Sequence, residues 1–494
     1  MERVKMRLKA MNGAAVDSII LVFIQVVTTA VGLVVSKILS VNFSLTEYGT
    51  YSQVMLITTT ASSLTILGMT NAVNYFFNGN TSYDEKQKYL GTLFDIQYVL
   101  GIFCALLLIL FRDPISIYFK NDQLKGILWV AACLPALQNL LPMMQVLFVA
   151  TGKAKLIAVR NFVISIARLI SVLLASYITK NIDTIIILLV LLDIVQIGCF
   201  RVLLKKSHIN ILIRDFDKYK LKKIFAFCLP MAVYLMTNSL SRDIDKYVVS
   251  YFADTETLAI YSNASKILPF DLISASFITV LIPIITRQVR SEDYTKALCS
   301  FKAYLRLGYI ATWILAFGAV VLSKNLMQFL YDIKYLAGLN VFIVYLFVDM
   351  IKFANTSLIL VAKGKTKTLM YASISALVCN GVLNIPAYKA FGIIGPAVIT
   401  LLITIALVIA LLIISARELN SNISKIFNLK EMLLIVVELI LVGTGIFLLR
   451  GVLEKYISSS TILLMICYVL YILALLALNW KRLLSCLKEI NQLR

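Results

Sequence analysis

The stretch Val149-Ala150-Thr151-Gly152-Lys153-Ala154-Lys155 returns, little changed, as Val361-Ala362-Lys363-Gly364-Lys365-Thr366-Lys367. The two copies begin 212 residues apart, and each stands between two long apolar runs. A second pair supports the first, because Tyr48-Gly49-Thr50-Tyr51-Ser52-Gln53 aligns with Leu258-Ala259-Ile260-Tyr261-Ser262-Asn263 at an offset of 210. Segments repeated at nearly one offset predict an internal duplication, so the chain should fold as two similar halves.

Composition excludes a soluble fold. Sixty per cent of the 494 residues are hydrophobic and 15% are charged, against about 25% charged in soluble domains. Apolar runs of roughly 20 residues, enough to cross a hydrocarbon core of about 30 Å, recur along the chain. They lie near residues 17–36, 48–70, 89–111, 126–149, 157–179, 184–204, 224–251, 258–286, 303–323, 339–362, 368–388, 393–415, 431–449 and 461–479. We therefore predict an all-α polytopic membrane protein with about 14 transmembrane helices.

The formal charge of +21 is a topology signal. Most Lys and Arg residues fall in the N-terminal segment and the even-numbered loops, which the positive-inside rule places in the cytoplasm. Both termini are then cytoplasmic, as an even number of spans requires. The remaining basic excess suits anionic lipid headgroups, so we expect membrane lipids and no nucleic acid as partners. The first apolar run lacks a small-residue cleavage site and is predicted to be a start-transfer helix.

The longest charged connection divides the chain into two six-helix lobes. We predict an N-terminal lobe over 1–206, a cytoplasmic inter-lobe loop over 207–223, a C-terminal lobe over 224–416, and an extra two-helix hairpin with a cytoplasmic tail over 417–494. Because six is even, both lobes enter the membrane in the same direction, and their pseudo-twofold axis should run along the membrane normal. Such parallel repeats, typical of transporters, predict a cleft between the lobes.

The sequence motifs do not predict an enzyme. A P-loop needs glycine five residues before the Gly-Lys pair, but Leu147 and Ile359 stand there, so we interpret both Gly-Lys pairs as turn residues. The lone histidine, His208, lies in the inter-lobe loop. The eight cysteines form no C-x-x-C pair, and we expect neither a disulfide frame nor a metal site nor a cofactor.

Ionisable residues inside the spans are functional candidates, because each is costly there unless it faces water or a partner. In the seventh span, Arg242, Asp245 and Lys246 share one helical face, with Asn238 one turn earlier. This stripe should line the cleft. The alternative is a structural ion pair between Arg242 and Asp245, which would leave Lys246 as an unmatched cation.

The fifth span carries a second polar stripe, of Asn161, Ser165 and Arg168. Arg168 has no acidic neighbour on its own helix. A guanidinium there suits either a phosphate-bearing ligand or an acid from another helix, for which Asp193 in the sixth span is the obvious candidate.

The tenth and eighth spans repeat the pattern. Its members are Tyr345, Asp349, Lys352 and Asn355 in the tenth span and Asn263, Lys266 and Asp271 in the eighth. Asp349 and Lys352 are either a satisfied pair or part of the cleft. Arg306 and Glu438 stand alone and receive no role. Summed over the predicted cleft, cations slightly outnumber acids, which favours an anionic, sugar-like substrate over a lipophilic cation.

Several stretches resemble the polysaccharide-transport proteins of the multidrug/oligosaccharidyl-lipid/polysaccharide exporter superfamily. They are Ser36-Lys37-Ile38-Leu39-Ser40, Glu47-Tyr48-Gly49-Thr50-Tyr51-Ser52, Leu229-Pro230, Asp245-Lys246 and Ala259-Ile260-Tyr261-Ser262-Asn263-Ala264-Ser265-Lys266. The resemblance implies a flippase for undecaprenyl-pyrophosphate-linked oligosaccharide repeat units of O-antigen or capsule, working by alternating access in the bacterial plasma membrane.

The resemblance also implies roles and partners. Arg168, Arg242, Lys246, Lys266 and Lys352 would contact the pyrophosphate or acidic sugars. The polysaccharide polymerase and chain-length machinery would be protein partners. The alternative is an Na⁺- or H⁺-coupled multidrug antiporter of the same superfamily, which would call for a carboxylate cluster. A membrane glycosyltransferase or polymerase would need paired external carboxylates and a larger external loop.

Overall fold

The chain is mainly helical in the part that its computed structural model describes, which is residues 24, 26–78, 82–151, 153–207, 209, 211, 218–270, 281–282 and 284–492. No β-strand occurs in those residues. Eleven of their helices are long and apolar enough to cross a membrane, and Val26–Asn42 forms a shorter apolar helix. The all-α polytopic prediction is confirmed. The count of fourteen spans stays a prediction, because parts of the first and eighth runs lie outside the described residues.

Contacts divide the chain into two compact units. The first comprises Met1–Leu240 and Ala253–Ala259, and the second comprises Ser241–Phe252 and Ile260–Arg494. The seventh-span helix α10 (Lys218–Phe252) is therefore shared between the units, as is α11 (Thr255–Ala264). The lobe boundaries predicted at 207–223 stay a prediction.

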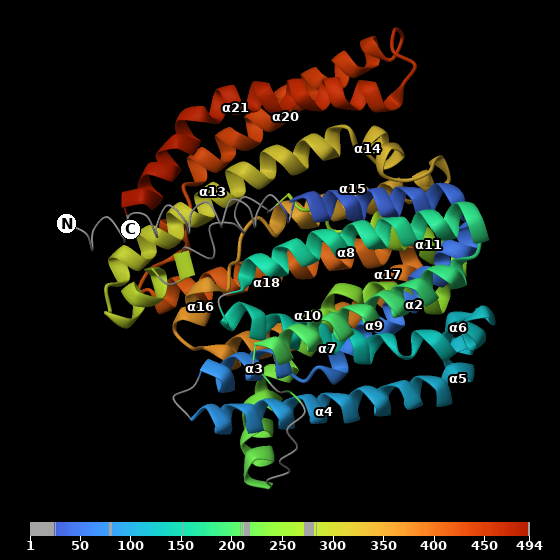
Figure 1. The fold of residues 1–494 in the computed structure, drawn as a ribbon. Helices are drawn as coiled ribbons and strands as arrows, with labels where there is room; N and C mark the ends of the chain where they lie inside the picture. Colours follow the sequence, from blue (N-terminus) through green and yellow to red (C-terminus); the bar gives the residue numbers. More distant parts are fainter. Residues whose placement is uncertain are drawn as a thin grey trace. The chain divides into compact units, whose positions relative to one another are not determined.

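The first unit is built of helices that pack around α7 (Figure 1). Its elements are α2 (Leu45–Thr65), α3 (Met69–Asn78), α4 (Tyr83–Leu110), α5 (Arg112–Phe119), α6 (Gln123–Ala131), α7 (Leu134–Ala150), α8 (Ala154–Leu174), the π-helical turn Ala175–Thr179 and α9 (Ile182–Lys206). Helix α2 begins at a capping box, in which the Glu47 N–H donates to Ser44 Oγ at 3.2 Å and the Ser44 N–H donates to Glu47 Oε2 at 2.9 Å. The core residues are mainly aliphatic and aromatic side chains of α3, α4, α7 and α9.

The second predicted span, 48–70, is not one continuous helix. Helix α2 ends at Thr65 and α3 begins at Met69. Between them Leu67 and Gly68 both have positive φ angles, of 44° and 71°. A left-handed turn of this kind interrupts the hydrogen-bond ladder of a helix, and an apolar run does not reveal it because leucine rarely adopts positive φ.

The duplicated Gly-Lys turn has the same backbone hydrogen bonding in both copies. The Lys153 N–H donates to Phe148 O at 2.8 Å, and the Lys365 N–H donates to Leu360 O at 2.8 Å. In the second copy Gly364 has a φ of 69° and its N–H donates to Val361 O, which completes a Schellman C-cap. The glycine is thus needed for the left-handed cap, and the prediction that Gly364-Lys365 is a turn is confirmed.

The lysines of both turns also reach matching positions. Lys153 Nζ donates to Ser207 Oγ at 2.6 Å, at the end of α9. Lys363 and Lys365 pair with Glu418 at 3.3 and 3.4 Å, at the end of α18. Ser207 and Glu418 are 211 residues apart, so the duplication extends to how each helix hairpin is closed.

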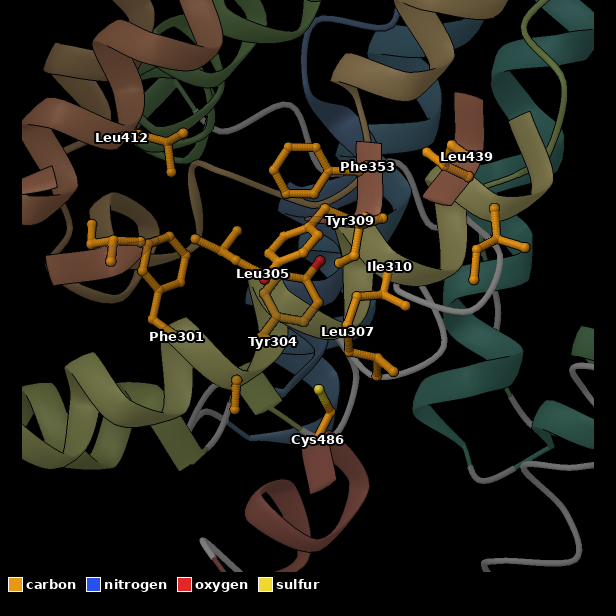
Figure 2. Close-up of a cluster of buried hydrophobic side chains, with 14 of the residues drawn as sticks. Phe301, Tyr304, Leu305, Leu307, Tyr309, Ile310, Phe353, Leu412, Leu439 and Cys486 are labelled. Atoms are coloured by element: carbon orange, nitrogen blue, oxygen red, sulfur yellow. The ribbon is translucent and has the colours of Figure 1, made fainter. Parts of the chain in front are cut away.

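The second unit has a buried hydrophobic core of its own, part of which Figure 2 shows. Its elements are α13 (Tyr294–Val321), α14 (Ser323–Leu330), the 3₁₀ turn Ile333–Gly338, α15 (Leu339–Ile351), α16 (Leu358–Ala362), α17 (Thr366–Phe391), α18 (Ile394–Glu418), α19 (Ile423–Ile426), α20 (Leu429–Leu453) and α21 (Ser460–Gln492). The Tyr309 ring meets the Phe353 ring edge-on, with centroids 6.1 Å apart. Leu439 of α20 and Cys486 of α21 belong to the same buried cluster.

The last two helices, α20 and α21, pack against α13 (Figure 1). Glycines allow this close packing, since a Cβ atom on Gly318 would lie 2.6 Å from the Tyr471 ring and one on Gly443 would lie 2.9 Å from the Phe317 ring. Gly445, two residues along α20, has nothing within 4 Å. The contacts of this hairpin are thus concentrated on one face of α20.

Arg306 and Glu438, isolated in the sequence, are both paired in the structure. Arg306 donates to Glu431 from Nη2 at 2.7 Å and from Nε at 3.0 Å, and to Glu489 from Nη1 at 3.0 Å. Glu438 accepts from Arg482 Nη1 at 2.8 Å. Both clusters join α20 and α21, and the first ties them to α13, so these charges hold the C-terminal hairpin in place.

Candidate functional site

A polar cavity of about 380 Å³ lies within the helices of the first unit. Its walls come from α8 and α9, with side chains from the first helix, α2 and α7. The polar lining residues are Thr28, Tyr51, Gln138, Arg160, Asn161, Ser165, Arg168 and Asp193. The predicted fifth-span stripe of Asn161, Ser165 and Arg168 therefore faces one cavity, together with the predicted partner Asp193.

Arg168 and Asp193 face one another across the cavity. The distance from Arg168 Nη2 to Asp193 Oδ1 is 3.8 Å. The Arg168 side chain is 49% exposed, whereas that of Asp193 is 3% exposed. Asp193 Oδ1 also accepts a hydrogen bond from Gln196 Nε2 at 2.9 Å. Both alternatives for Arg168 thus remain compatible with the site, because the guanidinium has an acidic neighbour and still presents half of its surface.

Arg160 is a second cation of this cavity, which the sequence pattern did not single out. Its Nη2 donates to Gln196 Oε1 and its Nη1 donates to Asn161 Oδ1 at 2.9 Å. The guanidinium carbon lies 5.2 Å from the centre of the Phe200 ring. The available signal was its place directly before Asn161 and inside the fifth predicted span, 157–179.

The cavity has one positive charge in excess among its described lining residues. Arg160 and Arg168 contribute two guanidiniums, and Asp193 contributes one carboxylate. Hydroxyl and amide groups of Ser165, Asn161 and Gln138 surround them. Guanidinium groups bind phosphate and carboxylate through paired N–H donors, and amides and hydroxyls suit sugar hydroxyls. The site can therefore hold an anion that also carries polar groups.

In the second unit, the predicted seventh-span stripe is arranged differently from the expectation. Asp245 is buried, and its Oδ2 accepts from the Tyr261 hydroxyl at 2.7 Å and also from the Tyr345 hydroxyl. Lys246 was predicted to be an unmatched cation if Arg242 paired with Asp245. It has a partner instead, because its Nζ lies 2.7 Å from Asp243 Oδ1. Residues three apart share a helix face, whereas Asp245 points about 100° away from Lys246. Arg242, on the same helix, is exposed.

The remaining second-unit candidates surround two interruptions of predicted spans. Helix α11 ends at Ala264, before Lys266, and α15 ends at Ile351, directly before Lys352. The Leu268 N–H donates to Asp349 Oδ2 at 3.0 Å. A membrane interior tolerates such non-helical backbone only where other groups form hydrogen bonds with its free N–H and C=O groups.

Further donors and acceptors complete this arrangement. The Asn355 N–H donates to the Tyr304 hydroxyl at 2.9 Å, and Trp313 Nε1 donates to Met350 O at 2.9 Å. The Lys266 ammonium lies 5.7 Å from the centre of the Tyr331 ring. The tenth predicted span, 339–362, is thus not one continuous helix, since six residues from Lys352 to Ser357 separate α15 from α16.

For three further candidate residues the structure gives burial at most. Asn263 is buried in α11, and Asn238 is half-buried in the part of α10 that belongs to the first unit. Asp271 lies outside the described residues. A single cleft lined by candidates of both units stays a prediction. Within the described residues no group of three His, Cys, Asp or Glu side chains could hold a metal ion.

A second cavity, of about 470 Å³, surrounds Arg306 in the second unit. Its charged lining consists of Lys302, Arg306, Glu431 and Glu489. Lys302 and Arg306 balance the charges of the two glutamates, and Arg306 already hydrogen-bonds to both of them. We therefore take the first-unit cavity as the candidate site.

A polytopic helical protein with a duplicated turn and a charged, polar cavity among its membrane helices has the construction of a transporter or flippase. The model of a family described as polysaccharide biosynthesis protein matches residues 34–340, more than half of the chain. The chain belongs to this family. No curated protein matches the sequence.

Solved structures share the fold. The inward closed conformation of the lipid II flippase MurJ aligns with a TM-score of 0.73 at 16% identity, covering 94% of this chain and 100% of that one. An inward-facing multidrug resistance MATE family transporter of the MOP superfamily aligns with a TM-score of 0.66 at 11% identity, covering 82% and 98%. The MATE transporter VcmN of Vibrio cholerae in its bent form aligns with a TM-score of 0.53 at 16% identity, covering 81% and 95%. At these identities the likeness concerns the fold.

Proposed function

We propose that this protein is a flippase that moves undecaprenyl-pyrophosphate-linked oligosaccharide repeat units across the bacterial plasma membrane, for O-antigen or capsule assembly. The observation that carries the proposal is the first-unit cavity, in which Arg160 and Arg168 face a single carboxylate. Membership in a polysaccharide biosynthesis family and a fold shared with a lipid II flippase support the same conclusion.

The chemistry of the lining matches both parts of such a substrate. Its pyrophosphate is anionic and suits the guanidiniums. Its sugars carry hydroxyls that the side chains of Gln138, Asn161 and Ser165 can bind. The polyprenyl chain is apolar and stays in lipid, so the protein needs to shield only the polar part of the substrate from the hydrocarbon core.

A multidrug antiporter is the alternative that the shared fold leaves open. Lipophilic cations are bound best by carboxylates and aromatic rings. The described lining has Asp193 as its carboxylate and two arginines against it. That balance favours an anionic substrate.

The proposed mechanism is alternating access. The two units rock so that the site opens first to the cytoplasm and then to the outside. Arg168, near the middle of its span, leaves Asp193 to engage the anionic substrate, and the pair forms again when the substrate departs. Exchange of one anion for another keeps the guanidinium compensated throughout the cycle, since an isolated charge inside the membrane is costly. The polymerase and chain-length machinery would receive the product.

The test is deletion and complementation in a strain that makes a defined surface polysaccharide. Deletion should cause lipid-linked repeat units to accumulate on the cytoplasmic face, and the wild-type gene should restore the surface glycan. Arg168→Ala should fail to restore it while its membrane level stays normal. Arg201→Ala, which removes an exposed cation of α9 away from the cavity, should complement fully.

Two outcomes would count against the proposal. Unchanged surface glycan together with raised drug sensitivity, in a deletion strain without a redundant flippase, would favour the antiporter. Loss of the Arg168→Ala protein from the membrane would instead assign Arg168 to structural pairing with Asp193.

A further inference from the structure

Arg160 is held in the cavity by neutral groups. Its described hydrogen-bond partners are amide oxygens of Gln196 and Asn161, and its Nε is buried with no hydrogen bond to a described residue. No carboxylate pairs with it within the described part of the chain. Arg168, by contrast, already has Asp193 at 3.8 Å. Among the described residues Arg160 therefore has no ion-pair partner, although Asp193 also acts on it electrostatically from beyond ion-pair distance.

The two arginines lie at different depths of one membrane helix. The candidate span containing α8 runs from Lys155 to Thr179. Arg160 and Arg168 follow Lys155 by five and thirteen residues, which at 1.5 Å per residue are about 8 and 20 Å along the helix axis. Arg160 is thus near the end that carries the basic loop, and Arg168 is near the middle. If that loop is cytoplasmic, as its charge predicts, Arg160 lies close to the level of the cytoplasmic headgroups.

Gln196 connects the two positions. Its side-chain oxygen accepts from Arg160 Nη2, and its Nε2 donates to Asp193 Oδ1 at 2.9 Å. Asp193 in turn faces Arg168 Nη2. An amide can do both at once, since it has an acceptor on one atom and donors on the other. The side chains of α9 therefore orient both guanidiniums of α8.

We propose that Arg160 is the pyrophosphate-recognising residue on the cytoplasmic side, that Gln196 is a positioning residue for it, and that Asp193 takes the place of the substrate's anion at Arg168 in the empty site. This inference rests on the proposed function, and it assigns the order in which the two arginines bind the substrate's pyrophosphate. The lipid pyrophosphate first meets Arg160, the arginine without an ion-pair partner among the described residues, near the headgroup level. Transfer to mid-membrane depth then requires the pyrophosphate to displace Asp193 from Arg168.

The test is binding of undecaprenyl pyrophosphate, without glycan, to the purified full chain in lipid nanodiscs. Arg160→Gln should weaken binding at least tenfold, because it removes a charge-assisted contact. Arg168→Gln should weaken binding by less than about threefold, since Asp193 already occupies that guanidinium in the empty site. Asp193→Asn should strengthen binding by freeing Arg168. Arg201→Gln is the charge-matched control and should leave binding unchanged.

Gln196→Met tests positioning. It should weaken pyrophosphate binding and reduce the preference for undecaprenyl pyrophosphate over neutral undecaprenol, with the melting temperature unchanged. A purely structural glutamine would lower the melting temperature and leave that preference as it was, which would overturn its assignment. The measured preference of the Gln196→Met variant therefore separates the two roles.

The outcomes also separate this inference from the proposed function. If Arg168→Gln abolishes pyrophosphate binding and Arg160→Gln does not weaken it, the order proposed here is wrong while the flippase remains. If wild-type protein does not bind undecaprenyl pyrophosphate and deletion leaves the surface glycan intact, the proposed function itself fails.

Discussion

Replacing Arg306 should destabilise the second unit strongly without touching the candidate site. Arg306→Gln removes the cation that donates four hydrogen bonds to carboxylates, three to Glu431 and one to Glu489. The Glu431 side chain is only 10% exposed, so the variant leaves a mostly buried carboxylate uncompensated. Removing one partner of a buried ion pair costs about 3–5 kcal/mol.

The lower end of that range applies here, because the Arg306 side chain is 20% exposed and Glu489 is 44% exposed. A loss of about 3 kcal/mol corresponds to a fall in melting temperature of roughly 6–12 °C for a unit of this size. Thermal unfolding of the detergent-purified protein, followed by size-exclusion chromatography, measures it. The control is Lys296→Gln, whose pair with Asp293 lies at the surface and should not shift the melting temperature detectably.

A double variant decides whether the charge is the cause. Arg306→Met combined with Glu431→Leu replaces both partners by apolar side chains of similar size, which at buried pairs is often neutral or stabilising. It should recover most of the lost melting temperature. A melting temperature for Arg306→Gln within about 2 °C of wild type, or a double variant no better than the single one, would refute this account of the hairpin.

Two further predictions concern glycines. Gly49→Ala should destabilise the first unit by about 1–3 kcal/mol, because the new Cβ would lie 2.2 Å from the backbone oxygen of Thr255. Gly32→Ala is the control and should not destabilise the unit, because nothing lies within 4 Å of its new Cβ. Gly364→Ala should cost about 1 kcal/mol at its φ of 69°, whereas Gly445→Ala, in an open stretch of helix, should gain roughly 0.5–1 kcal/mol. Melting temperatures check both pairs, and equal shifts within a pair would contradict the prediction.

Local and periodic features of the fold were predictable from the sequence. Long apolar runs predicted membrane helices because burying a span in lipid requires little beyond length and composition. The duplicated turn was predictable because glycine favours the left-handed C-cap that Gly364 adopts. The stripe from Asn161 to Arg168 was predictable for a similar reason, since residues seven apart return to one face of a helix.

Features that depend on distant partners were not predictable. Arg306 looked isolated because Glu431 and Glu489 follow it by 125 and 183 residues. The break at Leu67 could not be predicted, because leucine itself disfavours positive φ and the surrounding packing imposes it. The partner of Lys246 could be read from spacing alone, because Asp243 precedes it by three residues and so lies on its own helical face, whereas Asp245 does not.

The structure changes what the buried carboxylates mean for substrate charge. In the sequence, the four aspartates Asp193, Asp245, Asp271 and Asp349 nearly balance the five candidate cations and predict an amphoteric site with a mild cationic excess. In the structure, Asp245 accepts hydrogen bonds from two tyrosines, and Asp349 accepts the Leu268 N–H at an interrupted helix. Carboxylates that are already engaged by protein donors in this way have less capacity to bind a cationic substrate.

Asp193 is the carboxylate that lines the first-unit cavity, and there it faces two arginines. A cavity that binds drug cations would be expected to have the opposite balance, because each guanidinium repels a positive ligand at close range. The excess of one positive charge also gives Asp193 a role in the empty site, which is to compensate one of the two guanidiniums. Without it two guanidiniums would stand uncompensated inside the membrane whenever the site is empty, and in the proposed cycle Asp193 would release Arg168 only when an anionic substrate arrives.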